Sequence, residues 1–394
     1  MTNIAFSDKT KGLSGSAIRA TFKLLADPEI ISFAGGAPSS SLFPCDVLGT
    51  VAEEIFRTFG NTALQYGITE GYAPLRELVR ERLVRQGIIH EGDDIAITTG
   101  GQQVIDLTAK VLLNEGDCVV TERPSFVGGL NCFRSYNAVI DDVPVESDGM
   151  DIDYLEENIL KKKRIKLVYT IPTFQNPTGI TMSLEKRKKL LNLADRYDFY
   201  ILEDNPYGSL RYSGEEVPSI KSLDVSGRVI YGGSFSKILS PGLRIGFFSA
   251  PSEIFEKMIV CKQVTDVHTP VLTQLIAYTF VTRYDIDAHI KRACELYGKQ
   301  SSFMRSCISR YFPDYCSVTN PEGGIFLWCS LPERFDGEEL FRKAVEKKVA
   351  FVSGAACMAD PLKKYSSFRL NFSNASMENI EKGIRILGEV IESY

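Results

Sequence analysis

The chain has 394 residues, a formal net charge of −5, 44% hydrophobic residues and 24% charged residues. This composition is ordinary for a soluble globular protein, and the length predicts two domains rather than one small core. The dense basic run at residues 161–164 is too short for a nucleic-acid footprint. We therefore expect no nucleic-acid partner. No apolar run reaches membrane-span length and the N-terminus lacks a signal-peptide core, so we also expect no membrane partner.

Cysteine and histidine usage bounds the chemistry further. The nine cysteines are scattered and form no Cys-x-x-Cys pair, which favours reduced thiols and a cytoplasmic setting. The three histidines, His90, His268 and His289, show no metal-ligand spacing. We therefore expect no metal site and no metal hydrolase.

The N-terminal third offers a helix, a glycine turn and a tyrosine-rich loop. Residues 14–26 are compatible with a helix, and Arg19 lies off its apolar face. A strand that begins at Ile31 runs into the Gly35-Gly36 turn, where backbone can approach a ligand closely or simply reverse direction. The loop 64–72 is too rich in glycine and tyrosine to be mere linker.

From about residue 95 short apolar strands alternate with helices. The expected strands are 95–99, 118–121, 138–145, 167–170, 199–203, 228–231 and 244–250, and the expected helices 102–113, 126–136, 152–160 and 184–197. Such alternation predicts an α/β fold with a mainly parallel sheet covered by helices. Ligands of such sheets gather at the carboxyl ends of the strands.

After about residue 265 the pattern changes. A long helical stretch over 269–312 precedes strands around 325–330, a helix over 337–347 and a strand near 367–372. This order predicts a second, smaller α+β domain.

The turn between the last two strands of the first domain carries a distinctive set of side chains. Ser234, Ser236 and Arg244 combine small hydroxyls with a guanidinium, which suits a phosphate. Lys237, held beside them, can act as an amine nucleophile toward an aldehyde. Phosphate and aldehyde on one small molecule indicate pyridoxal 5'-phosphate, although the Ser-Phe-Ser-Lys string alone also occurs in ordinary surface turns.

Polar residues follow two other strands of this domain. Asp204 can pair with a pyridinium nitrogen and keep the ring an electron sink, or it can be a capping or salt-bridged aspartate. Tyr207 can offer its phenol to the 3'-oxygen of the ring. Asn176, in an Asn-Pro turn after the strand 167–170, can donate to the same oxygen.

Three further positions complete the candidate constellation. Gly101 and Gln102 open a helix and can present backbone N–H groups to an anion. Phe126 can stack on the ring or belong to the core. Arg369 is an arginine inside a strand that alternates apolar and polar residues, so it either clamps an α-carboxylate or lies on an exposed edge.

Together these motifs resemble the fold-type I, pyridoxal-phosphate-dependent aminotransferases of class I/II. The resemblance is strongest to the branch with 2-aminoadipate, kynurenine and multisubstrate aromatic or branched-chain aminotransferases and GntR-type regulator domains. It rests on residues 32–38, 64–76, 98–103, 174–179, 203–207, 234–246, 323–328 and 368–373. It implies an N-terminal arm and small-domain segment over 1–44, a large cofactor-binding domain over 45–268 with a mainly parallel seven-stranded sheet, and a C-terminal small domain over 269–394.

The same resemblance implies roles toward the cofactor. Lys237 would hold the cofactor's aldehyde carbon covalently and then carry the substrate's α-proton, and Asp204 would hold the pyridine nitrogen. Asn176 and Tyr207 would contact the 3'-oxygen. The phosphate would lie against Ser234, Ser236, Arg244 and the amides of Gly101 and Gln102. Phe126 stands where family members usually carry tyrosine, so stacking is kept while a hydroxyl is lost.

Roles toward the substrate and a second subunit also follow from the resemblance. Arg369, helped by Asn176, would bind the α-carboxylate, with Gly36 lying against the substrate. Arg19 would meet an acidic side chain, or it is simply a solvated helix arginine. Tyr66 resembles a tyrosine that reaches the neighbouring subunit's phosphate, which implies a homodimer with shared active sites.

The expected reaction moves an amino group from an L-amino acid to a 2-oxo acid, with 2-oxoglutarate as the expected acceptor. One alternative is a lyase or decarboxylase on the same fold. Another is a non-catalytic regulator that senses pyridoxal phosphate, but the motifs begin within the first forty residues and leave no room for a DNA-binding domain.

Overall fold

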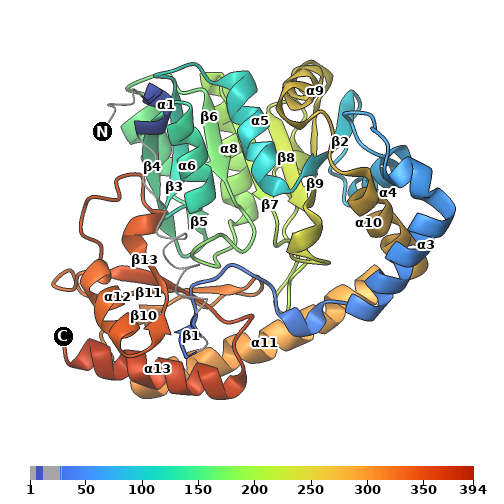
Figure 1. Cartoon of the computed structure of the whole chain (residues 1–394). Coiled ribbons are helices and arrows are strands. Elements are labelled where there is room, and N and C mark those ends of the chain that lie inside the picture. Colours follow the sequence, from blue (N-terminus) through green and yellow to red (C-terminus); the bar gives the residue numbers. More distant parts are fainter. Residues whose placement is uncertain (1–5, 12–26, 28) are drawn as a thin grey trace.

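The computed structural model describes residues 6–11, 27 and 29–394. A large sheet with helices packed on it forms one part, and a smaller sheet with two helices forms the other (Figure 1). The helix expected over 14–26, with Arg19, lies outside the described residues.

The large sheet has the strand order β2-β9-β8-β7-β6-β3-β4-β5. Its main strands are β2 (Asp93–Thr99), β3 (Cys118–Arg123), β4 (Val139–Glu146), β6 (Leu167–Thr170), β7 (Tyr200–Asn205), β8 (Val229–Ser234) and β9 (Ile245–Pro251). The pairs from β4 through β8 are parallel, whereas β9 runs antiparallel to both of its neighbours. All four residues of β6 are buried, as expected for a parallel strand covered on both faces.

The predicted number of strands needs one correction. All seven expected strands of the large sheet are present, but the sheet has eight strands because Gly149–Met150 forms β5, antiparallel to β4. Two residues are too few to show a period-2 pattern, so the sequence carries no strand signal there.

Helices on the two faces of the large sheet bury its apolar side chains. They include α5 (Gly101–Leu112), α6 (Val127–Ser135), α7 (Ile152–Tyr154) with the π-helical turn Leu155–Leu160, α8 (Leu184–Tyr197) and α9 (Ser252–Asp266). Beside the sheet, α3 (Cys45–Ala63) and α4 (Ala73–Arg85) pack against α10 (Val271–Arg283). Figure 1 shows α3 curving along the outer edge of the molecule. The sequence analysis had not identified α3 or α9.

The helical stretch expected over 269–312 is two helices rather than one. α10 ends at Arg283, and α11 (Ile286–Tyr311) begins after Asp285, whose side chain accepts a hydrogen bond from the Ala288 N–H at 2.9 Å. An aspartate at this position is a strong N-cap, which explains the break. α11 then runs below both sheets to pack on α13 (Met377–Glu392), as Figure 1 shows.

The smaller sheet has the order β10-β11-β14-β13. Its strands are β10 (Ser317–Val318), β11 (Phe326–Ser330), β13 (Val352–Ser353) and β14 (Ser367–Asn371), accompanied by α12 (Gly337–Glu346) and α13. β1 (Ile31–Ser32) pairs in parallel with β12 (Val349–Ala350), so the N-terminal segment reaches the C-terminal part of the chain. The domain boundaries at 44/45 and 268/269 stay a prediction.

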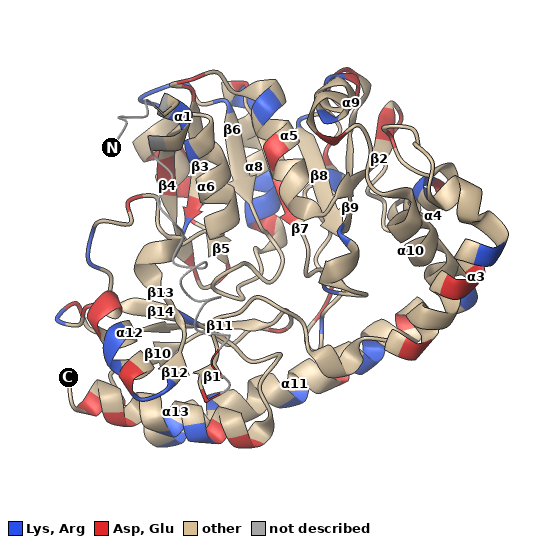
Figure 2. Ribbon diagram, in the orientation of Figure 1, with Lys and Arg blue, Asp and Glu red and all other residues tan. Residues whose placement is uncertain are grey.

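Positively and negatively charged residues are interspersed along the outer helices (Figure 2). Within the part of the chain that the structure describes, no helix is both long and apolar enough to cross a membrane.

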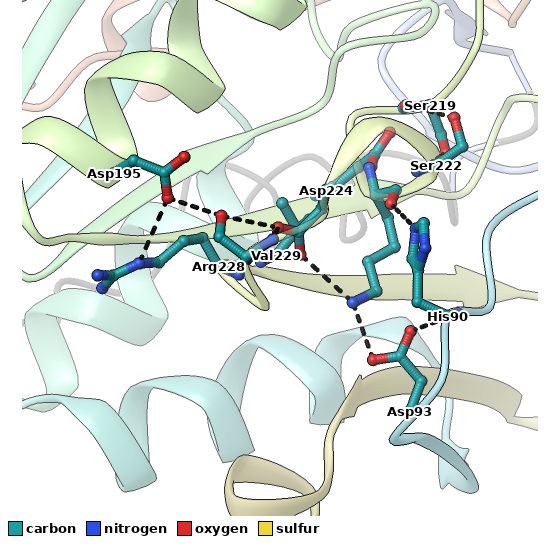
Figure 3. Close-up of polar contacts among 11 residues, drawn as sticks. His90, Asp93, Asp195, Ser219, Ser222, Asp224, Arg228 and Val229 are labelled. Atoms are coloured by element: carbon teal, nitrogen blue, oxygen red, sulfur yellow. Dashed lines mark hydrogen bonds and ion pairs between the residues drawn. The ribbon is translucent and has the colours of Figure 1, made fainter.

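A buried ion network ties the β7–β8 connection to the start of β2. Lys221 donates to Asp93 at 2.9 Å and lies 3.4 Å from Asp224, and all three side chains are almost fully buried. The His90 ring donates to the Lys221 carbonyl at 2.8 Å, and its backbone N–H donates to Asp93 (Figure 3). Glu203 accepts the backbone N–H groups of Ile220 and Lys221. Because Glu203 immediately precedes Asp204 in β7, this network supports the strand end at the candidate site.

We predict that Lys221→Met lowers the free energy of unfolding by about 3–5 kcal/mol, because it leaves two buried carboxylates without their cation. Urea unfolding at fixed protein concentration measures the loss. The control is Lys161→Met, which removes an exposed pair with Glu157 and should cost less than about 0.5 kcal/mol. Equal losses in the two variants would contradict a buried clamp.

Candidate active site

The turn after β8 gathers hydroxyl groups at the carboxyl end of the strand. Ser234 is the last residue of β8, and its Oγ lies 2.9 Å from the Ser236 Oγ and accepts the Ser236 backbone N–H at 3.0 Å. Arg244, just before β9, has a left-handed backbone and donates through Nη2 to the Thr99 carbonyl at 3.3 Å. Two hydroxyls and a guanidinium therefore lie beside the turn from β2 into α5.

Gly100 allows the start of α5 to approach this turn. Its φ is +78°, and a Cβ built on it would lie 2.3 Å from the Arg244 Nη2. Only glycine fits there, so the N-terminus of α5, with Gly101 and Gln102, lies close to Arg244. The first N–H groups of a helix have no partner within the helix and favour an anion. Together with the hydroxyls they make a cup that fits a phosphate group.

A polar network that sequence analysis missed supports the cup from below. Asp266, the last residue of α9, accepts hydrogen bonds from Thr99 Oγ1 at 2.7 Å, Gln103 Nε2 at 2.8 Å and Lys262 Nζ at 3.0 Å. Gln103 also accepts from the Thr99 N–H. These contacts fix the turn from β2 into α5. Lys262 and Asp266 lie about 160 residues from Thr99 and Gln103 and in none of the motifs identified in the sequence, so the sequence carries no signal for these contacts.

Asp204 provides a buried carboxylate at the end of β7. Its Oδ2 accepts a hydrogen bond from the Tyr169 hydroxyl at 2.9 Å. Burial raises the pKa of Asp204 to about 7, while the Tyr169 hydroxyl and the Lys237 ammonium act in the opposite direction. A carboxylate held this deep is suited to pairing with a cationic ring nitrogen rather than with solvent.

Lys237 lies three residues after the end of β8, and its Nζ donates to the Gly36 carbonyl at 2.6 Å. Burial, with the charges of Arg369 and Arg244, lowers the pKa of the Lys237 amine to about 8. A lysine of this kind is partly neutral near neutral pH, so it can serve both as a nucleophile toward an aldehyde and as a base.

A chain of contacts joins three of the predicted residues across the two parts of the protein. Arg369 on β14 donates through Nη1 to the Asn176 Oδ1 at 2.8 Å and through Nη2 to the Ala34 carbonyl at 2.6 Å. Asn176 in turn donates through Nδ2 to the Tyr207 hydroxyl at 3.3 Å. The Arg369 Nε is buried and has no hydrogen-bond partner, so the guanidinium keeps donor capacity for a carboxylate.

The loop that carries Asn176 is held by Glu122, which was also missed. Glu122 accepts hydrogen bonds from Thr170 Oγ1, the Ile171 N–H and Gln175 Nε2 at 2.7, 3.2 and 3.1 Å. Gln175 accepts both the N–H and the hydroxyl of Thr178. Glu122 lies near the carboxyl end of the buried strand β3, so the criterion that selected Asp204 could have found it.

Twelve of the fourteen predicted site residues line one cavity of about 520 Å³ at the carboxyl ends of the strands. They are Gly36, Gly101, Gln102, Phe126, Asn176, Asp204, Tyr207, Ser234, Ser236, Lys237, Arg244 and Arg369. Tyr66 is not among them, because its side chain is 81% exposed on the outer surface. Arg19 lies outside the described residues.

The donor set fits pyridoxal 5'-phosphate better than a metal ion. The cavity holds a phosphate cup, an amine and a buried carboxylate together, which are the groups that the three functional parts of this cofactor require. Over residues 6–11, 27 and 29–394, no three His, Cys, Asp or Glu side chains gather as a metal site would need.

Comparisons with known proteins agree with this chemistry. The family model described as aminotransferase class I and II matches residues 29–387. The chain is 43% identical to the aromatic-amino-acid aminotransferase 1 of Thermococcus litoralis, over 98% of this chain and 94% of that protein.

Two solved structures superpose closely. The kynurenine aminotransferase of Pyrococcus horikoshii, in complex with PMP, has a TM-score of 0.94 and 40% identity, over 98% of this chain and 97% of that one. The alpha-aminoadipate aminotransferase of Thermus thermophilus, complexed with N-(5'-phosphopyridoxyl)-L-leucine, has a TM-score of 0.91 and 37% identity over the same shares.

The raised pKa of Asp204 predicts a pH dependence of stability in the cofactor-free protein. The folded state keeps the Asp204 proton to higher pH than the unfolded chain, so ionisation costs stability as the pH rises from about 4 to 7. Asp204→Asn removes this cost. The difference between the unfolding free energies of Asp204→Asn and the wild type, measured in urea, should therefore shift in favour of the variant by at most about 4 kcal/mol as the pH rises from about 4 to 7. A difference between the two proteins that does not change with pH would contradict the assignment.

Proposed function

Because the chain belongs to the class I and II aminotransferase family and is a pyridoxal 5'-phosphate-dependent aminotransferase, we propose that its amino donors are neutral amino acids of the aromatic or branched-chain type. We propose 2-oxoglutarate as the amino acceptor. The observation that carries the donor class is the lining of the cavity. Apart from the groups assigned to the cofactor and the α-carboxylate, that lining is apolar.

Each end of the cavity takes one part of the cofactor in this proposal. Asp204 would hold the ring nitrogen, and Asn176 and Tyr207 would donate to the 3'-oxygen. Phe126, at the start of α6, would stack on the ring face, and the phosphate would lie in the cup formed by Ser234, Ser236, Arg244, Gly101 and Gln102. Bound pyridoxal 5'-phosphate supplies an electron-withdrawing ring that stabilises negative charge at the substrate's α-carbon.

Lys237 performs the proton transfer. Its amine would hold the cofactor's aldehyde carbon covalently in the resting protein and would be free for proton transfer while a substrate amine is bound there instead. The free amine has a pKa lowered to about 8, so it is sufficiently neutral to take the α-proton and sufficiently basic to hold it. The cavity brings Lys237 and Arg369 together, so one residue can move the proton while the other holds the substrate.

Arg369 and Asn176 bind the substrate's α-carboxylate. The guanidinium is already oriented by the Ala34 carbonyl and by Asn176, and it stacks on the Phe326 ring with its Cζ 4.2 Å from the ring centroid. This orientation limits the rotamer entropy that is lost on binding. Gly36, whose carbonyl accepts from Lys237, lies beside the substrate.

The substrate's side chain then meets apolar groups. The rest of the cavity lining consists of Ala34, Gly35, Ala37, Ile105, Ile171, Pro206 and Pro241. Among the described lining residues the cations are Lys237, Arg244 and Arg369, and all three have partners in the assignment above. An acidic substrate side chain would therefore need a cation from outside this lining, and Arg19 is the candidate for that cation. An acidic donor is the second possibility for this chain because one relative is an alpha-aminoadipate aminotransferase.

The active form in this proposal is a homodimer in which Tyr66 reaches the partner's phosphate cup. Exposed apolar side chains cluster in the neighbouring sequence: Phe56, Phe59, Leu64, Tyr66 and Ile68. The Tyr66 ring packs edge-on against His268, with centroids 5.9 Å apart. Large exposed aromatic groups of this kind are typical of protein interfaces.

We propose that the protein works in the cytoplasm. All nine cysteines are free thiols, and a reducing compartment keeps them so.

We predict that Lys237→Ala lowers the transamination rate at least about a thousandfold, because both the nucleophile and the base are lost. A steady-state assay of 2-oxo acid formation, with the visible absorption spectrum, measures the loss. Lys257→Ala, an exposed lysine on α9, is the matched control and should keep wild-type turnover. Substantial transamination by Lys237→Ala would overturn the assignment.

A second prediction concerns the amino donor. If the amino donors are neutral, Arg19→Ala should leave the ratio of kcat/KM for phenylalanine to kcat/KM for 2-aminoadipate within about twofold of the wild-type ratio. A rise of about tenfold or more, carried by loss of activity on 2-aminoadipate, would instead assign an acidic donor to this chain.

A further inference from the structure

Tyr169 reaches Asp204 from the neighbouring strand. In the β6–β7 register Tyr169 lies opposite Leu202, and Asp204 is two residues further along β7, so the three side chains share one face of the sheet. A long side chain can span this diagonal. The Tyr169 hydroxyl does so, donating to the Asp204 Oδ2 at 2.9 Å.

The ring of Tyr169 is fixed by α6. A Cβ at Gly129 would lie 2.8 Å from the Tyr169 Cε1, so a glycine at that position makes room for the ring. The Phe133 ring packs against it at a steep angle, with centroids 5.5 Å apart. Tyr169 is fully buried. Its hydroxyl is therefore held in place by packing before any ligand binds.

Asp204 accepts no other side-chain hydrogen bond among the described residues, so its Oδ1 is left for a ligand in the cavity. The Tyr169 hydroxyl and the Lys237 ammonium lower the pKa of Asp204 against the effect of burial, and the charge of Asp204 in turn raises the pKa values of Glu122, Tyr207 and Tyr231. Tyr169 is the group that donates directly. A hydrogen bond to a carboxylate stabilises its ionised form.

We propose that Tyr169 is a positioning residue that keeps Asp204 ionised and aims its free oxygen at the cofactor's ring nitrogen. This inference rests on the proposed role of Asp204. A carboxylate that already accepts a hydrogen bond is a weaker base, so the proton shared with the ring stays on the nitrogen. Without the Tyr169 hydroxyl, the proton moves toward Asp204 and the ring withdraws electrons less strongly.

Tyr169→Phe tests this in the holoenzyme, because phenylalanine keeps the ring packing and removes only the hydroxyl. We expect the 15N chemical shift of ¹⁵N-labelled pyridoxal phosphate to move toward the unprotonated value. The dissociation constant for pyridoxal phosphate should rise about tenfold, and kcat should fall about ten- to a hundredfold. The KM for the amino donor should change less than about twofold, since the α-carboxylate site is untouched.

Tyr136→Phe is the matched control. The Tyr136 hydroxyl also donates to a carboxylate, the Asp106 Oδ1 at 3.0 Å, but neither residue lines the cavity. This variant should keep the wild-type ¹⁵N shift, cofactor affinity and kcat. Melting temperatures of the two variants check that each is folded.

A double-mutant cycle with Asp204→Asn separates positioning from general packing. If Tyr169 acts through the carboxylate, Tyr169→Phe should change neither cofactor affinity nor kcat by more than about twofold in the Asp204→Asn background. Additive losses, or an unchanged ¹⁵N shift in folded Tyr169→Phe, would overturn the inference while the role of Asp204 stands. An Asp204→Asn variant with wild-type affinity and kcat would overturn that role as well.

Discussion

Burial of the Asp204 carboxylate at the end of β7 is the constraint around which the site is arranged. An ionised carboxyl group in an apolar sheet is costly unless hydrogen bonds or a cation compensate for it. Tyr169 supplies the hydrogen bond, and the Lys237 ammonium lies near enough to lower the pKa of the carboxyl group. In the proposed assignment the ring nitrogen of the cofactor would complete this compensation, so cofactor binding and the folded structure of the sheet would support each other.

Other polar groups of the cavity are likewise held in place by hydrogen bonds from neighbouring segments. Arg369 comes from the smaller sheet, yet both groups that hold it, the Ala34 carbonyl and Asn176, belong to other segments of the chain. The group proposed to bind the α-carboxylate is thus fixed by contacts between segments that are distant in the chain. Glu122 holds the Asn176 loop by accepting from Gln175, and Asp266 holds the turn at the phosphate cup by accepting from Thr99. Each functional side chain therefore has a second group that limits its motion, as preorganised sites require.

Much of this was accessible from the sequence, because strand ends in an α/β fold converge on one edge of the sheet. Asp204, Lys237 and Asn176 follow or end buried strands, and the structure brings them to one cavity. The supporting residues were missed for a physical reason. Tyr169 sits inside an apolar strand and looks like core, and the contacts of Asp266 depend on packing between distant helices. Hydrophobic periodicity also misses the two-residue strand β5 and the break at Asp285, because both are shorter than the window in which a periodic pattern can be recognised.

The most direct test of the account is to locate the covalently held cofactor. The purified protein would be incubated with pyridoxal 5'-phosphate, reduced with borohydride, digested and mapped by mass spectrometry. The account predicts one phosphopyridoxyl group per chain, on the peptide that contains Lys237. An unmodified Lys237, or an equal label on surface lysines, would contradict the claim that this cavity is the active site.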